Sequence, residues 1–272
     1  MTRTAAGAAL DELLGTVDSL AARRPVAARV VAMTDDDGVG AKELADVLVA
    51  DATLSARLMR LANSAYYGLG GRVRTVAFSV TVVGFTTVRT MAAVAAAGAD
   101  DESVLPADFW TRSKTTAVAC GELAGCFGLP TAESFCLGLL SSIGQAVLCQ
   151  HDPEGYPELL ALPEVADGGR AQLLAAEAER YGVRHTEVSA AALSAWTFPR
   201  EMARALHEVD RDVPGASPWA LCLRTGTAIA GGLLDAAAAP PSVVAVSAGA
   251  VPDERLAALL PRIRDGIADS QW

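Results

Sequence analysis

Apolar residues recur three and four residues apart along most of this chain, which is the spacing of amphipathic helices. Leu54, Leu58 and Leu61, for example, fall on one face of a single helix. Proline, glycine and short polar runs interrupt the pattern and mark where the helices end. The helices expected from this pattern cover residues 10–24, 25–33, 41–50, 51–64, 106–127, 131–150, 168–181, 185–197, 199–209, 216–236 and 252–268.

One segment has an ambiguous pattern. Val76, Phe78, Val80 and Val82 alternate with smaller or polar residues, which is the period of a strand. No second strand-like run lies nearby, however, and a lone strand has no partner for its backbone hydrogen bonds. We therefore predict a helix here as well.

A change in composition near residues 98–106 (GADDESVLP) predicts a boundary between two helical units. The expected architecture is all-α, with an N-terminal lobe of residues 1–100, a C-terminal lobe of residues 101–272 and about 12–14 helices. A chain of 272 residues is long enough to bury a core without disulfides or a structural metal.

Composition narrows the possible classes of function. Hydrophobic residues make up 51% of the chain, which excludes intrinsic disorder. The 22 basic and 32 acidic residues give a net charge of −10, so a nucleic-acid role is not expected. The five cysteines are an odd number without C-x-x-C spacing, which favours buried reduced thiols. No signal peptide or membrane span is expected, and the predicted location is the cytoplasm.

Several segments together resemble the HDOD domain, a bacterial family related to the HD-domain phosphohydrolases. The most specific of them contains LANSAYYG, and the others follow it in the family's order. The resemblance implies an all-α fold and a role in bacterial signal transduction or regulation. It extends over roughly residues 18–230, and the segments that carry it are residues 43–68, 73–92, 109–120, 134–148 and 181–196.

The sequence departs from the related HD enzymes at their metal ligands. Those enzymes hold divalent metals with histidine and aspartate, which activate water for phosphoester hydrolysis. Where GLLHDIG is expected, this chain has GLLSSIG, with Ser141 and Ser142. Arg112 and Ser113 stand where a ligating His-Ser is expected, and residues 220–230 have no carboxylate. We therefore expect no metal, no cofactor and no enzyme activity.

Positive charge is concentrated in one part of this acidic chain. Residues 52–99 contain five arginines and no acid, so this segment carries +5 and the remainder −15. Arginine beside tyrosine suits carboxylates, phosphates and flat bases. These residues also have a structural interpretation, in which they pair internally, cap a helix and pack between the lobes. The candidates for binding a partner are Arg57, Arg60, Asn63, Tyr66, Tyr67, Arg72, Arg74 and Arg89.

A second group of residues belongs to the expected former catalytic cleft. The two serines are expected to donate hydrogen bonds to carbonyls four residues earlier. Trp110, Trp196 and Trp219 are expected to fill the core or the interface between the lobes rather than to stack on a ligand. The candidates for ligand binding in the cleft are Arg112, Ser113, Ser141, Ser142, His185 and His207.

Three functions remain open at this point. The leading expectation is a non-catalytic regulatory module that binds a protein with an acidic surface. The alternative is a sensor of a nucleotide or cyclic dinucleotide in the former cleft, where Arg112 would face the ligand. A residual metal-dependent phosphohydrolase ranks below both, because the required ligands are missing.

Overall fold

The computed structural model describes residues 5–36, 38–99, 103–211, 215–234 and 242–268. Within these ranges the regular structure consists of seventeen α-helices and two short 3₁₀ helices, with no strand. The all-α prediction is therefore confirmed. Seventeen α-helices exceed the 12–14 expected because three of them, α10, α11 and α16, are short helices of four to six residues. Fourteen α-helices remain without these three.

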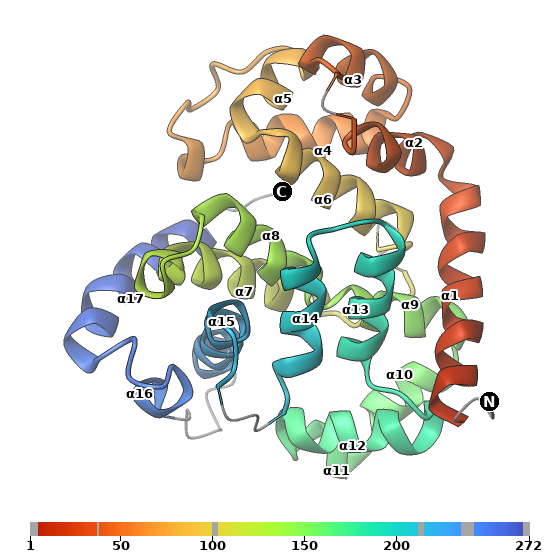
Figure 1. The fold of residues 1–272 in the computed structure, drawn as a ribbon, viewed down its shortest axis with the longest axis vertical. Helices are drawn as coiled ribbons and strands as arrows, with labels where there is room; N and C mark the ends of the chain where they lie inside the picture. The colour runs from red at the N-terminus through yellow and green to blue at the C-terminus, as the bar shows by residue number, and fades with distance from the viewer. Residues whose placement is uncertain (1–4, 37, 100–102, 212–214, 235–241, 269–272) are drawn as a thin grey trace.

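The N-terminal helices stack at one end of the molecule, except for α1, which runs down one side of it (Figure 1). Helix α2 packs against α3 and α6, and α5 packs against α3 and α4. Helix α1 contacts α9 and α13 of the C-terminal part as well as α2. The boundary near residue 100 stays a prediction. These elements are α1 (Ala5–Arg23), α2 (Pro25–Met33), α3 (Ala41–Leu48), α4 (Ala52–Ala62), η1 (Ala65–Tyr67), α5 (Val76–Val83) and α6 (Phe85–Ala96).

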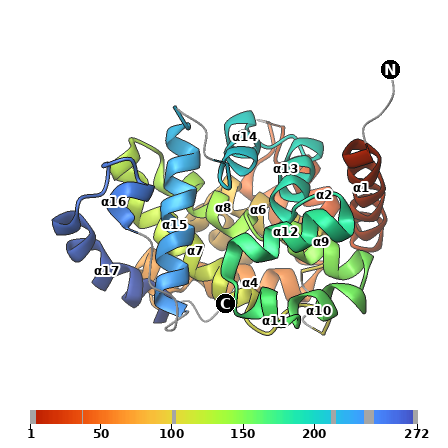
Figure 2. The same cartoon turned by 90° about the horizontal axis from the view of Figure 1, so that it is seen from below.

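The C-terminal helices surround α7, which packs against α8, α15 and α17. Figure 2 shows α15 crossing the molecule between α7 and α8 on one side and the outer helices α16 and α17 on the other. These elements are α7 (Phe109–Leu123), η2 (Ala124–Phe127), α8 (Thr131–Leu140), α9 (Ile143–His151), α10 (Gly155–Leu160), α11 (Pro163–Ala166), α12 (Gly169–Tyr181), α13 (His185–Ala195), α14 (Arg200–Glu208), α15 (Pro218–Leu234), α16 (Val243–Val246) and α17 (Asp253–Ala268).

The strand-like segment is helix α5, as predicted. Thr75 caps its first turn by accepting a hydrogen bond from the Phe78 N–H, and Gly84, with φ of +81°, ends it. Helices α5 and α6 meet at this glycine at an angle of 110°. The alternation of apolar residues arises because α5 contacts α3, α4 and α6, so more than one of its faces packs.

The expected helix 131–150 is divided into α8 and α9 at Ser141 and Ser142. Apart from the bent pair α5 and α6, the stretch formed by α8 and α9 is the one part of the described chain that is long and apolar enough to cross a membrane. Of its most apolar window, 72% is buried inside the protein, which is typical of a core helix. The five cysteines are all free thiols, and four of them are buried.

Glycine allows α8 and α9 to approach their neighbours closely. A Cβ on Gly138 would lie 2.7 Å from the Cα of Ala117 on α7. A Cβ on Gly144 would overlap the carbonyl oxygen of His185 at the start of α13. Since backbone atoms cannot move aside as a flexible side chain can, Gly138 sets the spacing between α8 and α7, and Gly144 sets the spacing between α9 and α13.

We expect Gly144→Ala to lower the free energy of unfolding by about 1–3 kcal/mol, because the added methyl group forces α9 away from α13. Gly15→Ala is the matched control, since nothing lies within 4 Å of a Cβ at this position of α1. The same change there should raise the free energy of unfolding by about 0.5–1 kcal/mol. Urea unfolding followed by circular dichroism measures both. Equal stability of Gly144→Ala and the native protein would contradict the close α9–α13 contact.

Candidate functional site

A cavity of about 980 Å³ lies between α7, the α8–α9 junction, α10 to α13 and α15. It corresponds to the cleft expected from the sequence, because Arg112, Ser141, Ser142 and His185 all line it. Ser113 and His207 do not belong to its lining. The lining contains the histidine His185 and the charged residues Arg112, Arg170, Arg224, Asp108, Asp167 and Asp210.

The two serines lie where α8 ends and α9 begins. Ser141 Oγ donates a hydrogen bond to the Gly138 carbonyl oxygen at 2.7 Å, three residues earlier rather than the four expected. Ser189 Oγ donates to the Ser141 carbonyl oxygen at 3.1 Å and accepts from the Gly144 N–H at 2.8 Å. Ser189 thereby satisfies backbone groups at the break between the helices, and the Ser141 hydroxyl is engaged with the backbone.

Arg112 and Ser113 have different surroundings although they are neighbours on α7. Arg112 lines the cleft and forms an ion pair with Asp108 one turn earlier. Ser113 is buried, and its hydroxyl has no hydrogen-bond partner among the described residues. His207 lies on α14 and is exposed at its surface. Desolvation and the nearby Arg211 lower the pKa of His207, and Glu187 opposes them in part.

A buried carboxylate holds His185 in place at the wall of the cleft. Glu177 on α12 is fully buried and accepts a hydrogen bond from Tyr156 Oη at 2.6 Å. Its Oε2 lies 2.8 Å from His185 Nδ1 and accepts from the His185 backbone N–H at 2.9 Å. Burial alone raises the pKa of Glu177, but the charge and hydrogen bonds of His185 outweigh it and lower that pKa.

Three of the charged cleft residues that escaped the sequence analysis, Arg170, Asp210 and Arg224, have hydrogen bonds within the protein. Arg170 binds Asp210 with two hydrogen bonds, of 2.7 and 3.1 Å, and Thr186 Oγ1 donates to the same carboxylate at 3.0 Å. Arg224 donates to backbone carbonyls, including that of Val209 at 2.9 Å. Arg170 and Asp210 are forty residues apart, so no local spacing announces their pairing. All three side chains are engaged inside the protein.

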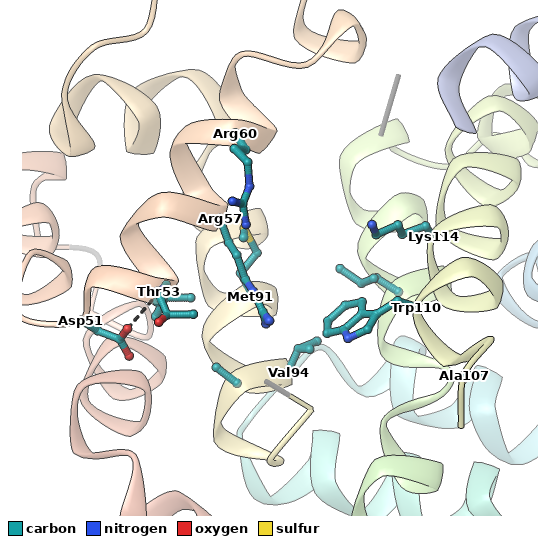
Figure 3. A pocket seen from close by; sticks show the side chains of 12 residues that line it. Asp51, Thr53, Arg57, Arg60, Met91, Val94, Ala107, Trp110 and Lys114 are labelled. Atoms are coloured by element: carbon teal, nitrogen blue, oxygen red, sulfur yellow. Dashed lines mark hydrogen bonds between the residues drawn. The ribbon is translucent and has the colours of Figure 1, made fainter. Parts of the chain in front are cut away.

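The five arginines of the positive segment do not form one face. Arg57 and Arg60 line a second, smaller cavity between α4, α6 and α7 (Figure 3). Arg72 and Arg74 are exposed on the chain between η1 and α5. Arg89, on α6, has only 11% of its side chain exposed. The segment therefore presents its arginines in three separate places.

Arg89 has internal partners that leave no role for it on an open surface. It forms an ion pair with Asp35 at 2.6 Å and lies 4.5 Å over the Phe198 ring. It also donates to the Trp196 carbonyl and, at 2.9 Å, to Thr197 Oγ1. Thr197 has a φ of +55°, which side-chain-bearing residues rarely adopt, so Arg89 stabilises an unfavourable turn after α13.

The structural interpretation of Asn63, Tyr66 and Tyr67 fits their contacts. Asn63 Nδ2 donates to the Val73 carbonyl at 2.8 Å, and its Oδ1 accepts from the Val73 N–H at 2.9 Å, which closes the loop between them. Tyr66 packs against Tyr67 and, at 5.4 Å between ring centroids, against Phe135 of α8. Burial raises the pKa of Tyr66 and raises that of Tyr67 to about 12.

Comparison with known proteins identifies the family of this chain. The sequence profile of the HDOD domain matches residues 20–211. The chain belongs to the HDOD domain family. None of the curated proteins matches the chain.

Solved structures support the HDOD fold. A Shewanella amazonensis protein described as a candidate phosphohydrolase is 26% identical over 94% of this chain and 95% of its own, with a TM-score of 0.69. The MmoQ response regulator from Methylococcus capsulatus is 27% identical over 87% of this chain and 95% of its own, with a TM-score of 0.50. An HDOD domain protein of unknown function from Geobacter sulfurreducens, 18% identical over 94% and 97% of the two chains, has a TM-score of 0.65.

The residues of this HDOD cleft do not fit a divalent metal. The positions expected for the His-Asp pair hold two neutral hydroxyls, and Arg112 adds a permanent positive charge at the wall. Asp210 is already bound by Arg170, and His185 by Glu177. No group of three histidine, cysteine, aspartate or glutamate side chains suited to a metal occurs in the described part of the chain.

The carboxylates of Glu177 and Asp210 make the free energy of unfolding depend on pH in the acid range. Burial raises the pKa of Asp210, but the charge of Arg170 and its hydrogen bonds outweigh burial, so that the pKa is lowered. The pKa of Glu177 is lowered as well. A lowered folded-state pKa means that the unfolded chain takes up protons first as the pH falls. The ordinary pKa values are 3.8 for Asp210 and 4.5 for Glu177. We therefore expect both carboxylates to contribute fully to the free energy of unfolding above these pH values and to lose that contribution progressively as the pH falls below them.

Glu177→Gln tests this dependence. It should lower the free energy of unfolding by about 3 kcal/mol near neutral pH, because it leaves His185 without its buried anion. It should also flatten the loss of stability between roughly pH 5 and pH 3. The control is Glu179→Gln, an exposed carboxylate on the same helix. Urea unfolding across pH measures both, and an unchanged acid dependence of Glu177→Gln would contradict the linkage.

Proposed function

We propose that this HDOD protein is a non-hydrolytic regulatory module that binds a protein partner with an acidic surface. Membership of the family and the likeness to the MmoQ response regulator support a role in signal transduction. The donor chemistry of the cleft supports the absence of hydrolysis, since it offers hydroxyls and arginine where a metal needs imidazole and carboxylate.

The observation that carries the proposal of a partner is the exposure of Arg72 and Arg74. Neither guanidinium forms a salt bridge with any residue in the described ranges. Phe78, in the first turn of the adjoining helix α5, is 46% exposed and is among the few large apolar side chains at the described surface. Two exposed cations and an exposed apolar side chain within one short stretch of chain suit an acidic segment that also carries an apolar residue. Arg72, Arg74 and Phe78 are called the loop surface below.

The loop surface is tested by reversing its charge. Arg72→Glu with Arg74→Glu should abolish capture of a partner from lysate of the native cells while circular dichroism stays unchanged. Capture by the native protein should also weaken as salt is raised from about 0.1 M to 1 M, where the screening length falls from ~10 Å to ~3 Å.

Arg200→Glu with Arg255→Glu is the matched control, because both arginines are exposed on helices of the C-terminal part. Protein mass spectrometry with quantification compares the three captures. The same proteins retained by native protein, loop variant and control alike would contradict the proposed surface.

The absence of hydrolysis is tested separately. Protein purified without chelator should hold less than about 0.1 equivalent of manganese, iron or zinc by elemental analysis, because the cleft lacks a ligand set. With Mn²⁺ or Mg²⁺ added, it should release no phosphate from phosphomonoesters or cyclic dinucleotides. Stoichiometric metal together with phosphate release would contradict a non-hydrolytic module.

A second candidate function is a nucleotide sensor in the cleft. It is favoured by the volume of about 980 Å³, near the top of the range of ~300–1,000 Å³ usual for small-molecule sites. Arg112 supplies a cation at the wall. Cyclic di-GMP is the appropriate probe, and Arg112→Gln should abolish its binding in a calorimetric titration if the cleft is the site.

A further inference from the structure

Large apolar side chains are rarely exposed at the described surface, and two of those that are exposed lie in stretches of opposite charge. Phe78 belongs to the loop surface, whose other members are Arg72 and Arg74. Leu162, between α10 and α11, is 41% exposed. Residues 152–169, which surround it, contain five acidic residues and no basic one. The chain therefore carries the kind of acidic segment with an apolar residue that suits its own loop surface.

Four of the five acids around Leu162 are free to meet a partner. Asp152 is engaged, because Arg180 lies 3.3 Å from its carboxylate and Tyr181 Oη donates to it at 3.0 Å. The other four are exposed, and their carboxylates have no hydrogen bond or salt bridge with any described residue. Helices α10, α11 and α12 contact one another and hold this stretch together. The acidic end, as it is called below, consists of Glu154, Glu158, Leu162, Glu164 and Asp167.

The third exposed apolar side chain of the described surface has less acidic surroundings. Val49 follows α3 and is 61% exposed. Lys42 on α3 offsets part of the negative charge there. Glu43 accepts a hydrogen bond from the Gly40 N–H at 2.9 Å, and the Asp51 carboxylate is engaged in capping α4. The acidic end is therefore the better match for two exposed arginines.

The loop surface and the acidic end belong to opposite ends of the molecule. Figure 1 shows α5 among the N-terminal helices at one end of the longest axis, and α11 and α12 at the other end. One molecule therefore cannot bring its own two surfaces together. Two molecules can do so, with the loop surface of one against the acidic end of the other.

We infer that the acidic partner of the loop surface is a second copy of this chain, bound through its acidic end. Arg72 and Arg74 of one copy pair with the free carboxylates of the other, and Phe78 packs against Leu162. This inference rests on the proposed function, because it names the partner of the same loop surface. The contact joins two different surfaces, so every added copy leaves one of each free and association continues head to tail.

Sedimentation velocity of the purified full-length protein, measured over a range of protein concentrations, tests the inference. The native protein should form dimers and then longer chains as its concentration rises. Raising the salt from about 0.1 M to 1 M should weaken this association, because it screens exposed charges. A protein that stays monomeric at every concentration would overturn the inference.

Charge reversal at either surface should weaken self-association about tenfold or more, because attraction is replaced by repulsion. The loop variant is Arg72→Glu with Arg74→Glu, and the acidic-end variant is Glu158→Lys with Glu164→Lys. Two control variants make the same changes in net charge at exposed positions elsewhere and should associate as the native protein does. These controls are Arg200→Glu with Arg255→Glu, and Glu12→Lys with Glu201→Lys. Unchanged circular dichroism shows that all four variants fold.

The apolar part of the contact is tested with a matched pair of substitutions. Leu162→Ser should weaken self-association, because it removes the side chain that Phe78 covers. Val49→Ser, at the most exposed of the large apolar side chains, should leave association unchanged. A stronger effect of Val49→Ser than of Leu162→Ser would place the contact on α3 and contradict the acidic end.

Mixing the loop variant with the acidic-end variant gives the sharpest test. Each variant alone sets like charges against each other, so each should remain monomeric. In the mixture, the negative loop surface of one variant meets the positive end of the other, and the remaining native surfaces also attract each other. Association should therefore return. A mixture that stays monomeric would refute the pairing of these two surfaces.

The fate of this inference can be told apart from that of the proposed function. A monomeric native protein that still captures a different protein through Arg72 and Arg74 would exclude the second copy and leave the proposed function standing. Self-association that is equally strong in the native protein and the loop variant would contradict the loop surface itself, and with it both proposals.

Discussion

The close packing of α8 and α9 against α7 and α13 is the constraint on which the rest of the structure depends. It is possible because Gly138 and Gly144 have no side chain where the neighbouring backbones pass. The break between α8 and α9 then lies directly beside the start of α13, and Ser189 joins the two by hydrogen bonds. This contact places Ser141, Ser142 and His185 around one cavity.

Contacts among side chains in and behind its wall support the cleft. Its charged side chains stabilise the protein itself: Glu177 anchors His185, and Asp210 joins Arg170 to Thr186. These interactions hold α12, α13 and the chain after α14 together around the cavity. This support comes from the protein's own side chains, as the proposed role in binding requires.

Arginine performs three different tasks within one short part of this chain. Arg89 is a structural residue that ties α6 to the turn after α13. Arg57 and Arg60 line the smaller cavity between α4, α6 and α7, whereas Arg72 and Arg74 are exposed. The smaller cavity and the loop surface share no residue.

The sequence alone determined the all-α class, most helix positions and the HDOD family, because these follow from local periodicity and from residue types at fixed spacing. It also predicted that α5 is helical despite its strand-like pattern. Only the tertiary structure decided which arginines are buried, that Trp110 and Lys114 complete a pocket with Arg57 and Arg60, and that Glu177 and Asp210 support the cleft. Those pairings join residues far apart in the chain, and their partners are chosen by how helices pack rather than by any pattern within one helix.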